Sequence, residues 1–152
     1  LQICEDFLMS FVFDIAAAQQ ASALGKYNQA MMNRNAKVKE QEAQAIKQQT
    51  EFDIAKFDKS YQQLVGQTKV AAAVSGAERS GSVLNVLRYN AEQAETEKDV
   101  ITYNSQVAQS QKMEEANFAR IQGNIARQQA RIAELGYYAK AGESLLRIGT
   151  AG

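Results

Sequence analysis

The feature that most constrains the fold of this chain is the absence of proline from all 152 residues. Proline inside a helix removes a hydrogen bond and costs about 3 kcal/mol, so a chain without it can form long uninterrupted helices. Ala, Gln, Glu and Lys, which favour helices, fill much of the sequence. Turn-forming residues cluster in the middle at one place, the stretch VSGAERSGSV at 74–83. The sequence therefore predicts an all-α fold with long helices and one central break.

The central break carries a helix stop signal followed by a helix start signal. Gly76 follows an apolar helical run and suits the left-handed conformation that often ends a helix. Ser80 or Ser82 precedes the next apolar run and suits an N-cap, where a hydroxyl accepts a hydrogen bond from a backbone amide. Signals this close predict a helical hairpin, and one helix kinked here is the alternative. The predicted corner at 75–82 contains Ser75, Gly76, Ser80, Gly81 and Ser82.

Residues 1–25 are predicted to form a separate, shorter amphipathic helix that Gly25 ends or bends. Its apolar face is a candidate for binding a membrane surface, and a packed core or a subunit interface is the alternative. Asp14 interrupts the apolar run, which is too short to span a bilayer as one helix. The candidate membrane-facing residues are Phe7, Leu8, Phe11, Val12 and Ile15.

Residues 26–135 are predicted to form the long hairpin, because apolar side chains recur alternately three and four residues apart, as in a coiled-coil seam. A helix of about 50 residues is roughly 75 Å long and needs a partner along its length. Met31, Val38 and Ile46 continue the seam more weakly upstream. The segment 136–152 contains glycines and is predicted to be a supple amphipathic tail. The predicted seam or interface residues are Ile54, Phe57, Tyr61, Leu64, Leu84, Leu87, Phe118, Ile121, Ile125, Ile132 and Leu135.

Alanine supplies much of the apolar fraction of 45%, and aromatic residues make up 8% of the chain. At about 25 cal/mol per Å² of buried apolar surface, an alanine interface contributes far less per residue than a core of Leu or Phe. We therefore expect a thin core that gains stability from neighbouring copies. Gly66 inside the first long helix costs about 1 kcal/mol relative to Ala, which indicates either a packing or hinge role or a tolerated cost.

The residue inventory excludes several kinds of functional site. The chain has no histidine and Cys4 is its single cysteine, which rules out an internal disulfide, a Cys/His zinc cluster and a Cys–His nucleophile pair. Adjacent carboxylates such as Glu114 and Glu115 point about 100° apart on a helix, so they do not face a common substrate. We predict no catalytic residue, cofactor or metal ligand, and expect that the protein is not an enzyme. Its net charge of zero gives no general attraction to nucleic acid.

Three arginines are predicted to share one face of the second long helix: Arg120, Arg127 and Arg131. One interpretation is a basic stripe that contacts the phosphates of DNA. The other is pairing with acidic residues of a neighbouring helix, such as Glu92 or Glu95 of another subunit. We favour the second, because no aromatic residues interleave the arginines as they do in surfaces that stack single-stranded bases.

The run LVGQTKVAAAVSGAERSGSVLNVLRYNAEQAETEKDVITYNSQVAQSQKMEEANFARIQGNIARQQARI resembles the smallest internal virion protein of short-tailed bacteriophages, also called an ejection or core protein. That family pairs an Ala/Gln-rich helix ending in a Ser-Gly corner with a second long helix. The resemblance covers residues 16–135. The residues that carry it are Ala72, Ala73, Ser75, Gly76, Ser80, Gly81, Ser82, Val83, Glu97, Asn104 and Ala119.

The resemblance implies a ring-like homo-oligomer in the internal core on the portal, inside the capsid of the virion. It implies ejection at infection into the host outer membrane and periplasm, where the protein helps to form a channel for the genome. The implied partners are the portal, other internal core proteins, the outer membrane and double-stranded DNA passing through. It names no catalytic residue and no cofactor. A coiled-coil scaffold or secretion-system component without a membrane phase is the alternative.

Overall fold

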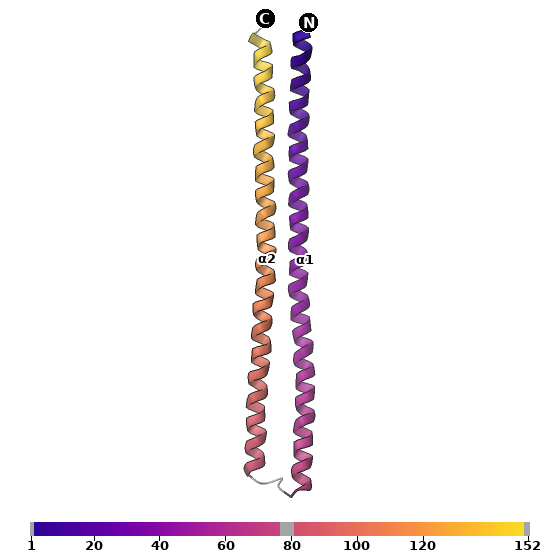
Figure 1. The fold of residues 1–152 in the computed structure, drawn as a ribbon, viewed down its shortest axis with the longest axis vertical. Helices are drawn as coiled ribbons and strands as arrows, with labels where there is room; N and C mark the ends of the chain where they lie inside the picture. Colours follow the sequence, from indigo (N-terminus) through magenta and orange to yellow (C-terminus); the bar gives the residue numbers. More distant parts are fainter. Residues whose placement is uncertain (1, 77–80, 151–152) are drawn as a thin grey trace. The chain divides into compact units, whose positions relative to one another are not determined.

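The computed structural model describes residues 2–76 and 81–150, apart from the side chains of residues 2–4, 7, 148 and 150. It contains two α-helices, α1 at Gln2–Val74 and α2 at Gly81–Thr150 (Figure 1). The described residues contain no strand. The predicted all-α hairpin of two long helices is therefore confirmed.

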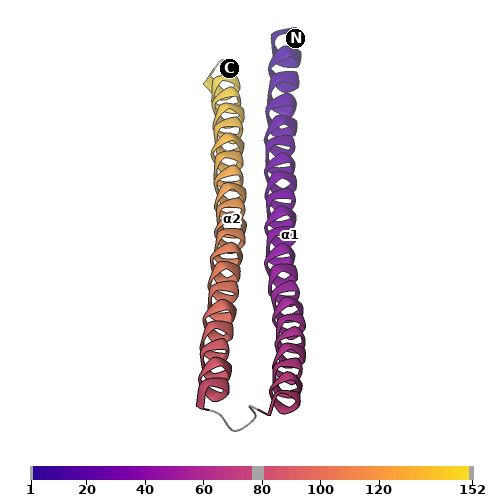
Figure 2. The ribbon, with the colours of Figure 1, turned by 60° about the horizontal axis from the view of Figure 1, so that its bottom comes forward.

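The chain divides into two units, and each contains a segment of both helices. Unit 1 consists of Leu1–Lys39 and Glu114–Gly152, and unit 2 consists of Glu40–Met113. Within each unit the α1 segment lies beside the α2 segment with the opposite chain direction, as both views show (Figures 1 and 2). The contacts between α1 and α2 described below lie within one unit or the other.

The contacts between the helices establish the antiparallel register in each unit. In unit 1, the Lys39 Nζ lies 3.2 Å from a carboxylate oxygen of Glu115. In the same unit, earlier residues of α1 contact later residues of α2, since Gly25 lies against Ala130. In unit 2, Thr50 contacts Ser105 and Asp58 contacts Lys98, which again pairs later α1 residues with earlier α2 residues.

The end of α1 has the predicted stop signal. Gly76 has a φ of 72°, the left-handed conformation that glycine adopts without strain. The amide of Ser75 donates to the carbonyl of Ala71 at 3.1 Å, and the Ser75 hydroxyl donates to the carbonyl of Ala72 at 3.0 Å. These bonds satisfy carbonyls that the helix end leaves without an intrahelical partner.

The first residue of α2 disagrees with one of the two predicted N-cap positions. Because α2 already includes Gly81, Ser82 lies inside the first turn rather than before it, and the prediction of an N-cap at Ser82 is wrong. Ser80, the other predicted N-cap, lies outside the described residues.

The helices are longer than predicted at both ends of the chain. The sequence predicts a separate helix that ends or bends at Gly25, but α1 runs without interruption from Gln2 to Val74. Gly25 is buried, and a side chain there would collide with Ala130 of α2, so this glycine permits close packing rather than a break. The predicted supple tail at 136–152 is helical to Thr150, and Ala141 within it is buried inside unit 1.

The buried seam between the helices consists of small residues. No large side chain among the described residues is fully buried, which agrees with the expected thin core. A Cβ added at Gly123 would lie 3.0 Å from the Cβ of Met32, so the backbones approach closely at this point as well. The buried seam residues are Ala18, Gly25, Ala36, Ala43, Ala72, Ala94, Ser105, Ala116, Gly123 and Ala141.

The seam follows the period of a straight helix rather than a strict heptad. The half-buried α2 residues Asn90, Ala108, Ala126 and Ser144 recur every 18 residues, which is five turns at 3.6 residues per turn. A strict seven-residue repeat drifts around a straight helix by about 20° per heptad. Apolar residues that keep the heptad spacing therefore leave the face that contacts the other helix.

Candidate assembly interface

Large apolar side chains of α1 lie on the face that points away from α2. Phe13 is 76% exposed and Leu24 is 58% exposed. Each lies two residues from a seam-facing position, and two residues correspond to about 200° around a helix. We call this set the α1 outer stripe, and it consists of Met9, Phe13, Leu24, Tyr27, Met31 and Val38.

Helix α2 has a matching α2 outer stripe in the same unit. Ile121 and Ile125 flank the buried Gly123 by two residues on either side, so they point away from α1. Ile132 is 70% exposed. The α2 outer stripe consists of Phe118, Ile121, Ile125, Ile132 and Leu135, and all five were predicted as seam or interface residues. They are not the seam with α1, because they lie on the far side of the helix from the buried Ala116 and Gly123.

The two outer stripes leave unit 1 with more large apolar surface outside than between its helices. A contiguous exposed apolar patch on a soluble protein indicates an interaction site when it exceeds a few hundred Å². Here the residues recur in register along two helices instead of being scattered singly. The arrangement is typical of a helix pair that is covered by another helical surface.

Each outer stripe has one charged residue within it or at its end, and the two residues carry opposite charges. Arg34 lies on the α1 outer stripe, three residues after Met31 and four before Val38, and is exposed. Glu114 lies four residues before Phe118 on the α2 outer stripe and is also exposed. Within the described part of the chain, neither residue forms an ion pair.

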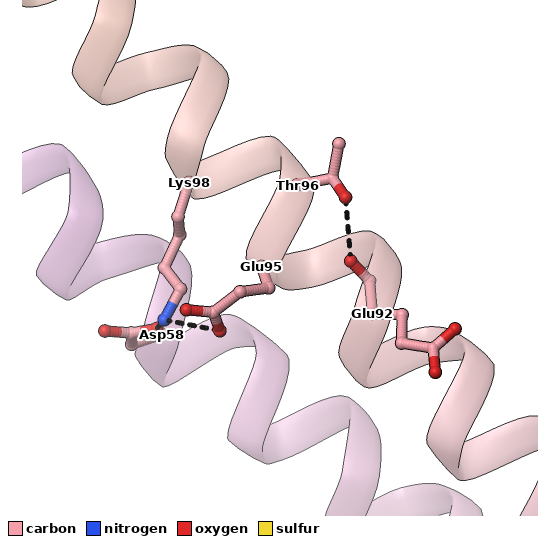
Figure 3. Close-up of polar contacts among 5 residues, drawn as sticks. All are labelled: Asp58, Glu92, Glu95, Thr96 and Lys98. Carbon is pink, nitrogen blue, oxygen red and sulfur yellow. Dashed lines mark hydrogen bonds and ion pairs between the residues drawn. The ribbon is translucent and has the colours of Figure 1, made fainter.

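Ion pairs join the two helices along the edges of the seam. In unit 2 the Nζ of Lys112 lies 3.0 Å from a carboxylate oxygen of Glu42, and the Nζ of Lys98 lies 3.1 Å from Asp58. Lys98 also lies 3.7 Å from Glu95 on its own helix (Figure 3). The hydrogen bond to Asp58 is the main cause that raises the pKa of Lys98 above its ordinary value of 10.5. These pairs fix which residues face each other across the seam.

A polar layer lies within the seam of unit 2. The hydroxyls of Thr50 and Ser105 hydrogen-bond at 2.6 Å, and Ser105 is buried. Gln109 Nε2 donates to the Ser105 hydroxyl at 2.9 Å, and the Thr50 hydroxyl donates to the Ile46 carbonyl at 2.8 Å. A satisfied polar group in an apolar seam disfavours shifted pairings, since a slip would leave it without partners.

The candidate membrane-facing residues divide between two faces of α1. Phe11 and Ile15 are half-buried toward α2, whereas Leu8 and Val12 are more than half exposed. The side chain of Phe7 lies outside the described residues. Asp14, which interrupts the apolar run, lines a polar groove of about 420 Å³ with Lys140, Glu143 and Arg147, among others.

The remaining predicted seam residues divide in a similar way. Most face the other helix, because Ile54, Phe57, Tyr61 and Leu87 are half-buried. Phe57, Tyr61 and Leu64 line an open groove of about 300 Å³ with residues of α2. The exposed members of this set are Leu64 and Leu84. Of the weaker upstream seam residues, Met31 and Val38 belong to the α1 outer stripe, and Ile46 is half-buried.

The three arginines do not form a uniformly exposed stripe. Arg127 Nη1 donates to the Ser22 carbonyl at 3.4 Å and to the Ser22 hydroxyl at 3.5 Å, so it contributes to the contact between the helices of unit 1. Arg120 is half-buried and Arg131 is exposed. Glu92 and Glu95, proposed as partners from another subunit, pair within their own helix with Arg88 and Lys98.

The described residues hold no cluster of His, Cys, Asp and Glu suited to a metal ion. No stretch of either helix, as far as it is described, has the length and hydropathy needed to cross a membrane. Comparison of the chain with protein families, with curated proteins and with solved structures found no significant match.

Sequence reasoning identified the residues of the α2 outer stripe as seam or interface residues, but they do not face α1, and it missed Met9 and Phe13 on α1. It also missed Gly123 as a point of close approach. The signal that could have found them is the row of small residues, including Ala18, Gly25 and Ala36, which marks the inner face of α1. The large residues two positions away then belong to the outer face.

Proposed function

We propose that this protein is a non-enzymatic structural subunit that works as an oligomer of helical hairpins. The observation that carries the proposal is the distribution of apolar residues in unit 1: the buried positions between α1 and α2 hold small residues, and large exposed side chains lie on the two outer stripes. A hairpin with this pattern gains more from contacts with neighbours than from its own seam, because large side chains bury more apolar area.

We further propose that the oligomer is an ejection protein of a short-tailed bacteriophage, which forms part of the internal core on the portal and then a channel in the host envelope. The support is the sequence resemblance around the corner, together with a fold made only of two helices in the described residues. A protein that leaves through a narrow tail must open and reform its structure. A seam of Ala and Gly suits that step, because little apolar surface must be exposed to open it.

Self-assembly is tested by sedimentation velocity of the purified chain over about a hundredfold range of concentration. We expect a concentration-dependent oligomer. A protein that remains monomeric and folded throughout the range contradicts the proposal at its first step.

The membrane step is tested by leakage of a dye trapped in vesicles. Val12 is exposed, belongs to the candidate membrane-facing set and lies off both the seam and the α1 outer stripe. We expect that Val12→Asp abolishes leakage, whereas Gln19→Asp, which places the same charge one heptad along at an exposed polar position, preserves it. Assembly without any vesicle binding over a range of pH supports the scaffold function instead.

A further inference from the structure

We infer that copies of this chain join side by side, with the α1 outer stripe of one copy packed against the α2 outer stripe of the next. The inference rests on the proposed self-assembly and specifies the surfaces that meet. It concerns unit 1, which contains both stripes.

The directions of the stripes exclude their pairing within one copy. Each stripe lies about 200° from the inner face of its own helix, so the two point away from each other on opposite sides of the pair. A copy therefore offers two different apolar surfaces. Contacts between unlike surfaces repeat from copy to copy and generate a ring when the rotation closes.

The register of the hairpin brings apolar residues opposite each other in such an arrangement. Copies related by rotation about an axis parallel to the helices keep the same height, so α1 of one copy faces the same level of α2 in its neighbour as in itself. Because Gly25 lies level with Ala130, Leu24 of one copy is close in height to Ile132 of the next. The Lys39–Glu115 pair places Val38 near the height of Phe118 in the same way.

The charges favour pairing of unlike stripes over pairing of like stripes. Two α1 outer stripes would place one Arg34 near another, and two α2 outer stripes would do the same with Glu114. Unlike stripes bring Arg34 to within about 9 Å of Glu114 along the helix axis, which is comparable to the screening length at physiological salt. The long side chains of arginine and glutamate can shorten this separation while the copies keep the same height. Opposite charges that approach as water is excluded select the partner surface.

Charge reversal tests the pairing. We expect that Arg34→Glu and Glu114→Arg each shift the concentration for half-assembly upward by at least about tenfold, which corresponds to roughly 1.4 kcal/mol. An equimolar mixture of the two variants restores assembly, because alternating copies then present opposite charges at every contact. Lys26→Glu, the same change at an exposed position off the stripe and far from Glu114 along the helix axis, leaves assembly unchanged.

Cysteine crosslinking provides an independent readout of the same contact. In a Cys4→Ser background, Leu24→Cys combined with Ile132→Cys is expected to give a ladder of covalent multimers on mild oxidation. Leu24→Cys alone gives none. Dimers from Leu24→Cys alone, or failure of the mixed charge variants to restore assembly, overturn the inference while leaving self-assembly intact. A wild-type chain that stays monomeric overturns both the inference and the proposed function.

Discussion

Gly25 of α1 lies so close to Ala130 of α2 that a methyl group on Gly25 would overlap the Ala130 side chain. The contact replaces the bend that the sequence predicts at Gly25 with a point of tight packing. We expect Gly25→Ala to destabilise the hairpin by about 1–3 kcal/mol through overpacking, in spite of the better helix propensity of alanine. Chemical denaturation at one fixed protein concentration measures this.

A double variant that exchanges the residues at positions 25 and 130 provides the control for Gly25→Ala. The double variant Gly25→Ala with Ala130→Gly moves the methyl group from one helix to the other and is expected to recover most of the lost stability. No recovery would show that the cost arises elsewhere than at this contact.

Gly66 is expected to respond in the opposite way to the same substitution. It lies exposed within α1, and a Cβ at this position meets no other atom within 4 Å. Gly66→Ala should therefore stabilise the chain by about 1 kcal/mol, the propensity difference between the two residues. The thermal midpoint compared with wild type at equal concentration measures the gain. A loss of stability would instead support the packing or hinge role left open by the sequence.

The polar layer at Ser105 is expected to contribute measurably to stability. Ser105→Ala removes the partner of the Thr50 hydroxyl and of Gln109 Nε2 in a buried position, which should cost about 1–2 kcal/mol. Ser110→Ala, at an exposed position on the same helix, is the matched control. In a double-mutant cycle with Thr50→Val the two effects should not add, and simple additivity would contradict a shared hydrogen bond.

The ion pair of Lys98 with Asp58 predicts a pH dependence on the alkaline side. Because the hydrogen bond to Asp58 raises the pKa of Lys98 in the folded state, the charged lysine stabilises the fold. This contribution is fully present below the ordinary value of 10.5 and is lost as the pH rises through the raised pKa.

Denaturation midpoints of wild type and Lys98→Met test this dependence. We expect a constant difference between them from neutral pH to about pH 10, and a difference that shrinks above it. Lys59→Met, at an exposed position on α1, serves as control and should show no such change. A difference that persists undiminished at the highest pH would assign the effect to packing of the lysine stem rather than to its charge.

The hairpin itself could be predicted from the sequence because its signals are local. The absence of proline and the single stop signal at Gly76 act on the backbone directly, and the structure confirms the left-handed glycine. The inner face of each helix could not be predicted from large apolar residues. Heptad spacing predicts that Ile121 and Ile125 face the seam, whereas these residues lie on the outer stripe of α2 in unit 1.

The reason for this difference is physical. Two helices that pack at close distance select Ala, Gly and Ser for their contact, and these residues carry little weight in a search for hydrophobic periodicity. Ala116 and Gly123 are buried, while Phe118 between them is exposed. A search that follows large apolar residues therefore selects Phe118 and misses Ala116 and Gly123.

The seam of small residues also determines how a lone hairpin responds to denaturant. No large side chain of the described residues is fully buried between α1 and α2, so separation of the helices uncovers less apolar area than the opening of a core of Leu or Phe. The slope of unfolding free energy against urea, and the heat-capacity increment on melting, both scale with that area. An isolated copy should therefore melt over a broad range, and a sharp transition will appear only once neighbouring copies have associated.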